Sequence, residues 1–199
     1  MKDCTKFQDL GYIHINALSL FTGQELETIN RVLESIPLEE VSVGDTSEKS
    51  NMEVGRLLVD YPGELPRVTN SELCRPVINI LESNDKINFF RSLAPKAKCL
   101  RRAQFNIMNE GSFLDIHLDC ESNPDYLLAV SLQLEESYEG GEFIIHNKNN
   151  NKVKLKQFEV CISSCKINHE VTKVLSGKRV TLVCFLSSNM RENSRNVVS

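Results

Sequence analysis

Apolar and polar residues alternate with a period of two over much of the chain from about residue 98 onward. Such alternation is typical of strands that bury one face, because successive side chains of a strand point to opposite faces. It recurs in about seven short segments, with turn-forming residues between them: 102–107, 114–119, 128–134, 143–145, 153–155, 158–162 and 179–186. Short strands at this close spacing predict an antiparallel jelly roll, or double-stranded β-helix.

The first third of the chain shows helical periodicity instead. A capping-box pattern at Thr22–Glu25 is followed by apolar residues at helical spacing, and Pro37 ends the run. A second helix is predicted to begin near Ser71, with Pro76 in its first turn, where the missing N–H costs little. We expect these helices to pack on the jelly roll, which makes the fold mostly β with N-terminal helices, α+β overall.

Shorter segments complete this picture. Residues 12–15 resemble a short strand, and residues 86–93 a short helix. The polar run 41–53 contains glycine, aspartate and several serines, and predicts a loop. The asparagine- and lysine-rich run 147–152 predicts the tip of a hairpin.

The chain of 199 residues has the length of one domain with a sizeable core. We therefore expect a single domain over residues 1–199. Within it, residues 1–97 form a helical or mixed support region and residues 98–188 form the jelly-roll core. Residues 189–199 are expected to be a polar, frayed tail.

Composition narrows the class of protein. Hydrophobic residues make up 41% of the chain and charged residues 25%, which is typical of a globular domain. The formal net charge of −4 gives no indication of nucleic-acid binding. No apolar run approaches the length of a membrane span and no signal peptide is recognisable, so we expect no membrane association. The seven cysteines, an odd number, predict reduced thiols in a cytoplasmic protein.

A possible metal site is indicated by the His-Leu-Asp sequence at 117–119. In a strand, residues i and i+2 share a face, so the imidazole of His117 and the carboxylate of Asp119 would project side by side. His169 could complete a set of two histidines and one carboxylate. This ligand set is expected of non-haem Fe(II) oxygenases, because it leaves coordination positions open.

Two further motifs make the combination less common than a lone His-x-Asp. Arg179 and Thr181 begin ten residues after His169 and also share a strand face. A guanidinium with a hydroxyl beside it suits the bidentate binding of a carboxylate. Between the two histidine motifs, the Gly140-Gly141 pair permits a tight turn and a close approach of the backbone.

Together these segments resemble the Fe(II)/2-oxoglutarate-dependent dioxygenases, and within them the prolyl 4-hydroxylase-like branch. The resemblance covers a little under half of the chain and rests on five motifs: Asn-Glu-Gly at 109–111, His-Leu-Asp at 117–119, Tyr-Glu-Gly-Gly-Glu-Phe at 138–143, His-Glu-Val at 169–171 and Gly-Lys-Arg-Val-Thr at 177–181. It implies that His117, Asp119 and His169 bind iron. It also implies that Arg179 grips the distal carboxylate of 2-oxoglutarate and that Thr181 assists.

One position departs from the pattern of this branch. Met108 stands where a tyrosine that contacts the inner end of 2-oxoglutarate is often found. Strand parity leaves four polar residues that could supply this contact: Gln104, Asn106, Ser131 and Gln133. Of these we select Gln104 and Gln133 as candidates.

The resemblance implies a hydroxylase that oxidises an unactivated C–H bond and converts 2-oxoglutarate to succinate. Its expected requirements are Fe(II), 2-oxoglutarate and O₂, with ascorbate as a stimulant. The expected substrate is a small amino-acid-like, peptide or natural-product molecule. Asp119 favours hydroxylation over halogenation, because family halogenases carry a small residue at this position; desaturation and cyclisation stay open, as does the oligomeric state.

Other functions compete with this one. A non-enzymatic jelly-roll binding module with a vestigial site would be expected to lack a ligand residue, and none is missing. A nucleic-acid demethylase of the same superfamily would carry a further arginine where Phe185 stands. A cupin-like metalloenzyme that does not use 2-oxoglutarate would leave Arg179 and Thr181 without a task.

Two local patterns allow a second interpretation. Cys161, Cys165 and His169 have a spacing that admits a zinc site, although structural zinc usually has four ligands and a tighter cysteine pair. Arg101 and Arg102 could bind substrate together, or could form a solvated strand end.

Overall fold

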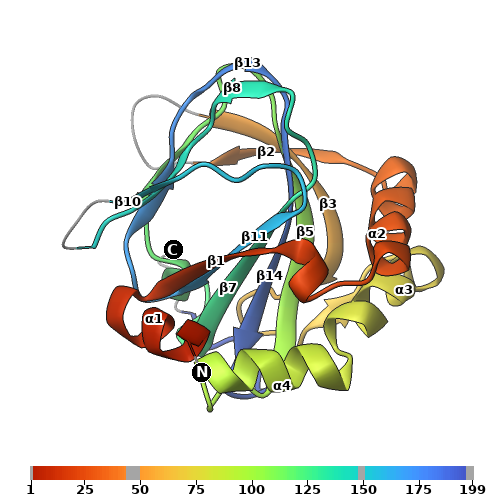
Figure 1. The fold of residues 1–199 in the computed structure, drawn as a ribbon. Coiled ribbons are helices and arrows are strands. Elements are labelled where there is room, and N and C mark those ends of the chain that lie inside the picture. Colours follow the sequence, from red (N-terminus) through yellow and green to blue (C-terminus); the bar gives the residue numbers. More distant parts are fainter. Residues whose placement is uncertain (1, 44–49, 148–150, 196–199) are drawn as a thin grey trace.

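The computed structural model describes residues 2–43, 50–147 and 151–195 (Figure 1). Its helices are α1 (Lys2–Leu10), α2 (Gly23–Ser35), α3 (Ser71–Leu81) and α4 (Asn84–Leu93), with the short 3₁₀ helices η1 (Ala17–Ser19) and η2 (Asp119–Glu121). Its strands are β1 (Tyr12–Asn16), β2 (Glu39–Val43), β3 (Ser50–Val59), β4 (Arg67–Val68), β5 (Cys99–Met108), β6 (Leu114–His117), β7 (Tyr126–Gln133), β8 (Tyr138–Gly140), β9 (Phe143–Ile145), β10 (Asn151–Val153), β11 (Glu159–Ser164), β12 (His169–Val171), β13 (Val174–Gly177) and β14 (Arg179–Ser187).

The strands form a jelly roll of two main sheets. The larger sheet has the order β1-β11-β7-β14-β5-β3-β2, with β4 beside β3, and the smaller one has the order β10-β9-β12-β6. The short pair of β8 and β13 closes the upper end of the molecule in Figure 1. The predicted fold, a mostly β jelly roll with N-terminal helices, is confirmed.

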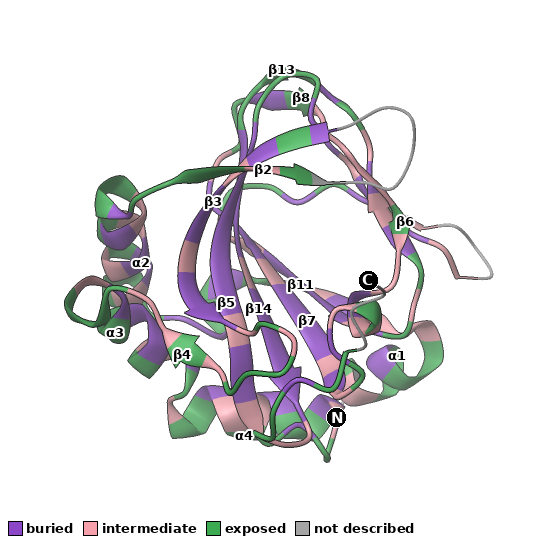
Figure 2. Cartoon of the chain, turned by 180° about the vertical axis from the view of Figure 1, so that it is seen from behind, coloured by how far each residue is buried: buried purple, intermediate pink, exposed green. Residues whose placement is uncertain are grey.

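The main core lies between the larger sheet and the helices. Along β5, the side chains of Ala103, Phe105 and Ile107 join this core, as the period of two predicts. The helices contribute apolar residues such as Ile29 of α2 and Phe90 of α4. In Figure 2 the central strands β5, β14, β7 and β11 are largely buried, so the larger sheet is covered on both faces. The face of the larger sheet that points away from the helices can therefore line an internal site.

The capping box predicted for α2 is present. The Thr22 hydroxyl accepts from the backbone N–H of Glu25 at 3.2 Å, and the Glu25 carboxylate accepts from the Thr22 N–H at 2.7 Å. The helix ends at Ser35, just before Pro37, as expected. The short strand predicted at 12–15 and the helix predicted at 86–93 also form, as β1 and α4.

The prediction of a loop over residues 41–53 is wrong at both of its ends. Residues at one end belong to β2 and residues at the other end to β3, and these strands pair antiparallel with Val41 opposite Met52. β2 lies at the edge of the larger sheet and exposes Glu39 and Glu40, so its sequence lacks the apolar alternation of a covered strand. Residues 44–49 lie outside the described residues.

The predicted place of Pro76 is also wrong. Helix α3 begins at Ser71, so the proline lies in its second turn rather than its first. Its missing N–H would have bonded the carbonyl of Glu72. Both Glu72 and Pro76 are exposed, so water can solvate the unpaired carbonyl.

Two further predicted segments, the hairpin tip and the C-terminal tail, lie partly within the described residues. β9 and β10 pair antiparallel with Ile145 opposite Asn151, while the centre of the predicted hairpin tip, 148–150, lies outside the described residues. The tail does not fray at its start, because Asn193 is 2% exposed and donates to the carbonyl oxygens of Asp60 and Ser122. Residues 196–199 are outside the described part.

No helix in the described ranges has the length and apolarity that a membrane crossing needs.

Candidate metal centre

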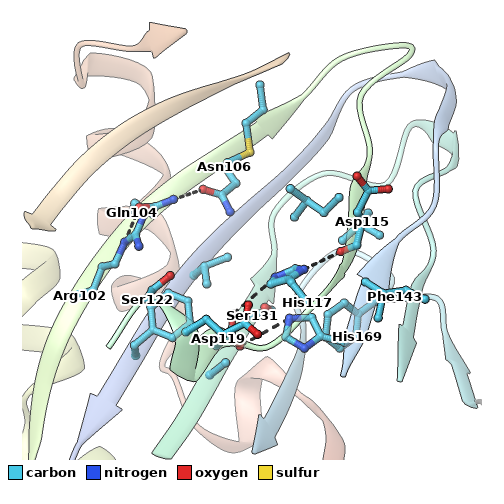
Figure 3. Close-up of a pocket in the computed structure, with 18 of the residues that line it drawn as sticks. Arg102, Gln104, Asn106, Asp115, His117, Asp119, Ser122, Ser131, Phe143 and His169 are labelled. Atoms are coloured by element: carbon cyan, nitrogen blue, oxygen red, sulfur yellow. Dashed lines mark hydrogen bonds and ion pairs between the residues drawn. The ribbon is translucent and has the colours of Figure 1, made fainter. Parts of the chain in front are cut away.

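A cavity of about 400 Å³ lies between the two main sheets. One wall is the inner face of the larger sheet, with polar side chains from β5 and β7. The opposite wall comes from β6 and β12 of the smaller sheet, together with η2. Figure 3 shows the row Arg102, Gln104 and Asn106 along β5, facing His117 and His169 across the cavity.

Three potential metal ligands meet on the wall formed by the smaller sheet. His117 is the last residue of β6, Asp119 begins η2, and His169 is the first residue of β12. β12 pairs with β6 so that the two histidines stand opposite each other. One ligand atom from each of the three residues lies within 4.8 Å of the other two. The Nε2 atoms of His117 and His169 lie 3.7 and 3.5 Å from the Asp119 carboxylate.

The strand that was expected to continue through Asp119 ends at His117. The prediction of one strand over 114–119 is therefore wrong for its last two residues. Leu118 nevertheless keeps an extended backbone, with φ −113° and ψ 128°, before the chain turns into η2. His117 and Asp119 thus still lie on the same side, because one extended residue between them is enough for the i, i+2 relation.

Both histidines are oriented by backbone carbonyls. His117 Nδ1 lies 2.7 Å from the carbonyl oxygen of Asp115, and His169 Nδ1 lies 2.9 Å from that of Ile167. A carbonyl oxygen can only accept, so each Nδ1 carries the proton. In the neutral rings Nε2 then presents a lone pair toward Asp119, the arrangement that metal-binding histidines need.

The electrostatics of this group favour a charged carboxylate. Burial alone would raise the pKa of Asp119, but the two neighbouring histidines outweigh it and hold this pKa at about 2. Burial would likewise lower the pKa of His117, yet the Asp119 carboxylate raises it above its ordinary value. Asp119 Oδ2 is buried and has no hydrogen-bond partner in the described part of the chain. His169 Nε2 lies 3.5 Å from this oxygen, which is longer than a typical hydrogen bond.

A second polar group lies on the opposite wall, around Arg179. This first residue of β14 is 5% exposed, and its Nε has no partner among the described residues. Its Nη1 contacts the sulfur of Met108 at 3.7 Å. Burial lowers the pKa of Arg179, and Tyr138 beside it opposes that shift. Among the described residues, no carboxylate pairs with this buried guanidinium.

The Gly140-Gly141 turn makes room for this guanidinium. Gly141 has φ 59°, a backbone conformation that favours glycine. A Cβ atom at Gly141 would lie 3.0 Å from Cδ of Arg179 and 3.2 Å from Cε2 of Tyr138. The motif thus permits the close approach that the sequence predicted. Tyr138 is the neighbour of Arg179 that the sequence analysis did not single out, although it lies within the same motif.

Thr181 and Gln133 lie next to each other in the register of β14 and β7. Both are fully buried, and neither the Thr181 hydroxyl nor Gln133 Oε1 has a partner in the described ranges. Gln133 Nε2 donates to the carbonyl oxygens of Val180 and Glu135, so its amide protons are already bound. Gln104, Asn106 and Ser131 line the cavity, whereas Gln133 and Thr181 lie just outside its lining.

The structure does not bring Cys161 and Cys165 together with His169 as a zinc site would require. In the part of the chain that is described, the metal-compatible group is His117, Asp119 and His169, without Cys161 or Cys165. Both are free, buried thiols, and burial raises the pKa of Cys161 to about 12. They behave as packing residues.

Comparison with known proteins gives consistent results. Residues 103–187 match the sequence model of the 2OG-Fe(II) oxygenase superfamily. The structure of an oxidoreductase of the 2OG-Fe(II) oxygenase family from Burkholderia pseudomallei is 31% identical, with a TM-score of 0.92 over 98% of this chain and 93% of that one. A PKHD-type hydroxylase of Prochlorococcus marinus (strain AS9601) is 29% identical over 178 residues, which is 86% of this chain and 77% of the relative. A Pseudomonas putida prolyl-4-hydroxylase shares the fold at 14% identity, with a TM-score of 0.66 over 94% and 97% of the two chains.

The jelly roll with this cavity is therefore that of an iron-dependent oxygenase. The chain belongs to the 2OG-Fe(II) oxygenase superfamily, and its similarity to a PKHD-type hydroxylase supports a hydroxylase. Membership implies Fe(II) and 2-oxoglutarate as metal and cosubstrate. The resemblance predicted from the motifs is confirmed, and so is the prediction of an oxygenase rather than a non-enzymatic module.

Proposed function

We propose that this chain is a hydroxylase of small amino-acid-like substrates that converts 2-oxoglutarate to succinate. In this proposal His117, Asp119 and His169 hold Fe(II), and Arg179 with Thr181 holds 2-oxoglutarate. The observation that carries it is the position of three ligand atoms within 4.8 Å of one another, in the same cavity as a buried guanidinium whose Nε has no partner in the described chain. Its seven free cysteines suit a reducing compartment, and we place the protein in the cytoplasm.

The three ligand residues fit a divalent iron ion. Two Nε2 lone pairs and a carboxylate oxygen without a hydrogen-bond partner point toward one another, and no other described side chain competes for Asp119 Oδ2. Two imidazoles and one carboxylate suit Fe(II) and leave positions open for cosubstrate and O₂. When bound, the iron supplies the oxidising chemistry together with 2-oxoglutarate and O₂.

The group around Arg179 fits one carboxylate of 2-oxoglutarate. A buried donor without an acceptor costs free energy, and a carboxylate would satisfy Arg179 and accept from the Thr181 hydroxyl. Tyr138 and Gly141 shape the space on the other side of the guanidinium.

For the inner end of 2-oxoglutarate, the chain offers Gln104 and Asn106 rather than Gln133. Gln104 and Asn106 line the cavity from β5. Gln133 Nε2 already donates to two carbonyl oxygens, and its remaining Oε1 is an acceptor that a carboxylate would repel. The amide of Gln104 is therefore the preferred candidate from the pair that sequence selected.

The test is succinate formation from 2-oxoglutarate by purified protein with Fe(II), ascorbate and O₂, with and without a pool of free amino acids. The Asp119→Ala variant should lose turnover by more than about 100-fold, because removing even a group behind a metal ligand costs about 10- to 100-fold. The matched control is Asp125→Ala, a carboxylate on the same loop but outside the metal-compatible group.

Each outcome decides something. Turnover that rises with an amino acid and disappears only in Asp119→Ala supports the proposal. Bound iron without turnover under any condition would contradict the amino-acid-like substrate and favour a carrier-bound or macromolecular one. A wild-type protein that binds neither Fe(II) nor 2-oxoglutarate would contradict the proposal as a whole.

A further inference from the structure

Two neighbouring arginines of β5 have opposite environments. Arg102 lines the cavity, whereas Arg101 is fully buried outside it and pairs with Asp60. The strand pairing explains the difference. Phe185 of β14 stands opposite Arg102 and Leu186 opposite Leu100, so β5 has a bulge at Arg101. Arg102 shares the cavity face of β5 with Gln104 and Asn106, as the period of two requires, and the bulge changes the direction of Arg101.

Arg102 has only part of its hydrogen-bonding capacity in use. Its Nε donates to Oε1 of Gln104 at 2.9 Å, and its guanidinium lies 5.8 Å from the centre of the Phe185 ring. Asp119 lines the same cavity, but its ion pairs in the described chain are with His117 and His169. Within the described residues, the two terminal nitrogens of the guanidinium have no acceptor. A fork with both ends available suits a carboxylate.

The contacts behind Arg102 hold this fork in place. Because Gln104 Oε1 accepts from Arg102, its Nε2 is the donor to Oδ1 of Asn106. Gln104 is 4% exposed and Asn106 is 8% exposed, so the row is rigidly packed rather than solvated. Figure 3 shows the three side chains in line along the wall. A guanidinium held by a neighbour and an aromatic ring loses little entropy when it binds a ligand.

Arg102 and Arg179 lie at different ends of the same cavity wall. Arg179 stands opposite Met108 in the register of β14 and β5, and Arg102 lies six residues earlier on β5. At about 3.3 Å per residue, the two backbone positions are roughly 20 Å apart. Gln104 and Asn106 lie between them on this wall, so a five-carbon dicarboxylate that is held by Arg179 and contacts Gln104 leaves the outer end of Arg102 unused. Arg102 is therefore available to a second molecule, and its row faces the three ligand residues across the cavity.

We propose that Arg102 binds a carboxylate of the primary substrate, which is then a free amino acid or a related small carboxylic acid. This inference rests on the proposed function and names the group by which the substrate is recognised. The cavity volume of about 400 Å³ lies at the small end of ligand sites, which favours a compact molecule over a folded protein segment. The carboxyl end of a short peptide carries the same chemistry and is distinguished in the test.

The experiment measures binding without turnover. Protein loaded with Ni(II) and 2-oxoglutarate is titrated with a panel of free L-amino acids and with their primary amides, and binding is followed by ligand-observed NMR. At least one acid should bind about 10- to 100-fold more tightly than its amide, the range expected for hydrogen bonds to a charged group. Arg102→Gln should lose this preference, Arg102→Lys should keep part of it, and the exposed control Arg75→Gln should keep all of it. Peptides ending in the best residue test whether a chain end binds equally well.

Several results would overturn the inference. Equal binding of acid and amide would do so, as would a preference that persists in Arg102→Gln, or the absence of any carboxylate that binds. Tighter binding of the peptides would replace the free amino acid by a chain end. Binding of Ni(II) and 2-oxoglutarate is measured first in every variant. If wild-type protein fails that step, the proposed function fails; if it passes and the carboxylate preference is absent, only the role of Arg102 fails.

Discussion

Two groups of buried charge in this molecule differ in how completely their polar atoms are paired. Around Asp60, one carboxylate oxygen accepts from Arg101 at 2.9 Å, and the other accepts from Asn123 at 2.8 Å and from Tyr126 at 2.7 Å. Around Asp119, one carboxylate oxygen has no hydrogen-bond partner in the described chain. Buried polar groups are normally satisfied, so the first group has what it needs and the second lacks a partner.

The difference separates a structural role from a binding role. The Asp60 group joins distant parts of the chain, because Arg101 also donates to the carbonyl oxygens of Glu64 and Arg191. Asn123 of this group follows η2, which carries Asp119. The fully paired group around Asp60 thus supports the loop that carries Asp119. Unpaired atoms at Asp119, Arg179 and Thr181 are what a site for a metal and an anion would leave when the ligands are absent.

The largest expected effect comes from breaking the fully paired group around Asp60. Asp60→Asn should lower the free energy of unfolding by about 3–5 kcal/mol, because it leaves the Arg101 guanidinium buried without a counter-charge. Urea denaturation of the metal-free protein measures this loss. The double variant Asp60→Asn/Arg101→Met should recover part of it. A loss below about 1 kcal/mol would mean that the pair is no more important than a surface ion pair.

The second largest effect is expected at Arg179, in the proposed 2-oxoglutarate site. Arg179→Gln should weaken 2-oxoglutarate binding by about 10- to 100-fold, because it removes hydrogen bonds to a charged ligand. Fe(II) binding should stay close to that of wild type, since Arg179 is not among the three ligand residues. Isothermal titration with 2-oxoglutarate in the presence of Ni(II) gives the first value and anaerobic titration with Fe(II) gives the second, with Arg75→Gln as control. Unchanged cosubstrate affinity would contradict the proposed role of Arg179.

Acid titration of the metal-free protein tests the Asp119 carboxylate directly. The pKa of Asp119 is about 2 in the folded protein, against 3.8 for an ordinary aspartate. A depressed pKa stabilises the fold above the unfolded value, and that contribution is lost as pH falls through the folded value. Between pH 3.8 and about 2, wild type should therefore lose about 2 kcal/mol more than Asp119→Asn. Parallel stability curves for the two proteins would show that the histidines do not stabilise the carboxylate.

The smallest effect is expected from Thr181. Thr181→Val keeps the shape of the side chain and removes a hydroxyl that has no partner within the described residues. Stability should stay unchanged or rise slightly, while the KM for 2-oxoglutarate should increase about two- to tenfold, as for the loss of one hydrogen bond. A clear loss of stability without a change in KM would make Thr181 a structural residue and remove it from the proposed site.

Much of this architecture could be predicted from local patterns. The capping box at Thr22, the period of two along β5, and the separation of His117 from Asp119 by one residue each depend on neighbours a few positions away. Such signals survive in the sequence because backbone geometry alone relates the side chains. The same holds for Arg179 and Thr181, which share a face of β14 wherever that strand pairs.

The sequence by itself therefore determined the class of fold and brought out the three residues proposed as metal ligands, whereas the tertiary structure decided how neighbouring residues divide between roles. The polar sequence around residue 41 forms an edge strand only because β3 is there to pair with it. The period of two already places Arg102 on the face of Gln104 and Asn106, whereas the bulge against β14 and the partner Asp60 decide where Arg101 lies. Register and bulges depend on a partner strand far away in the chain, so no local pattern encodes them.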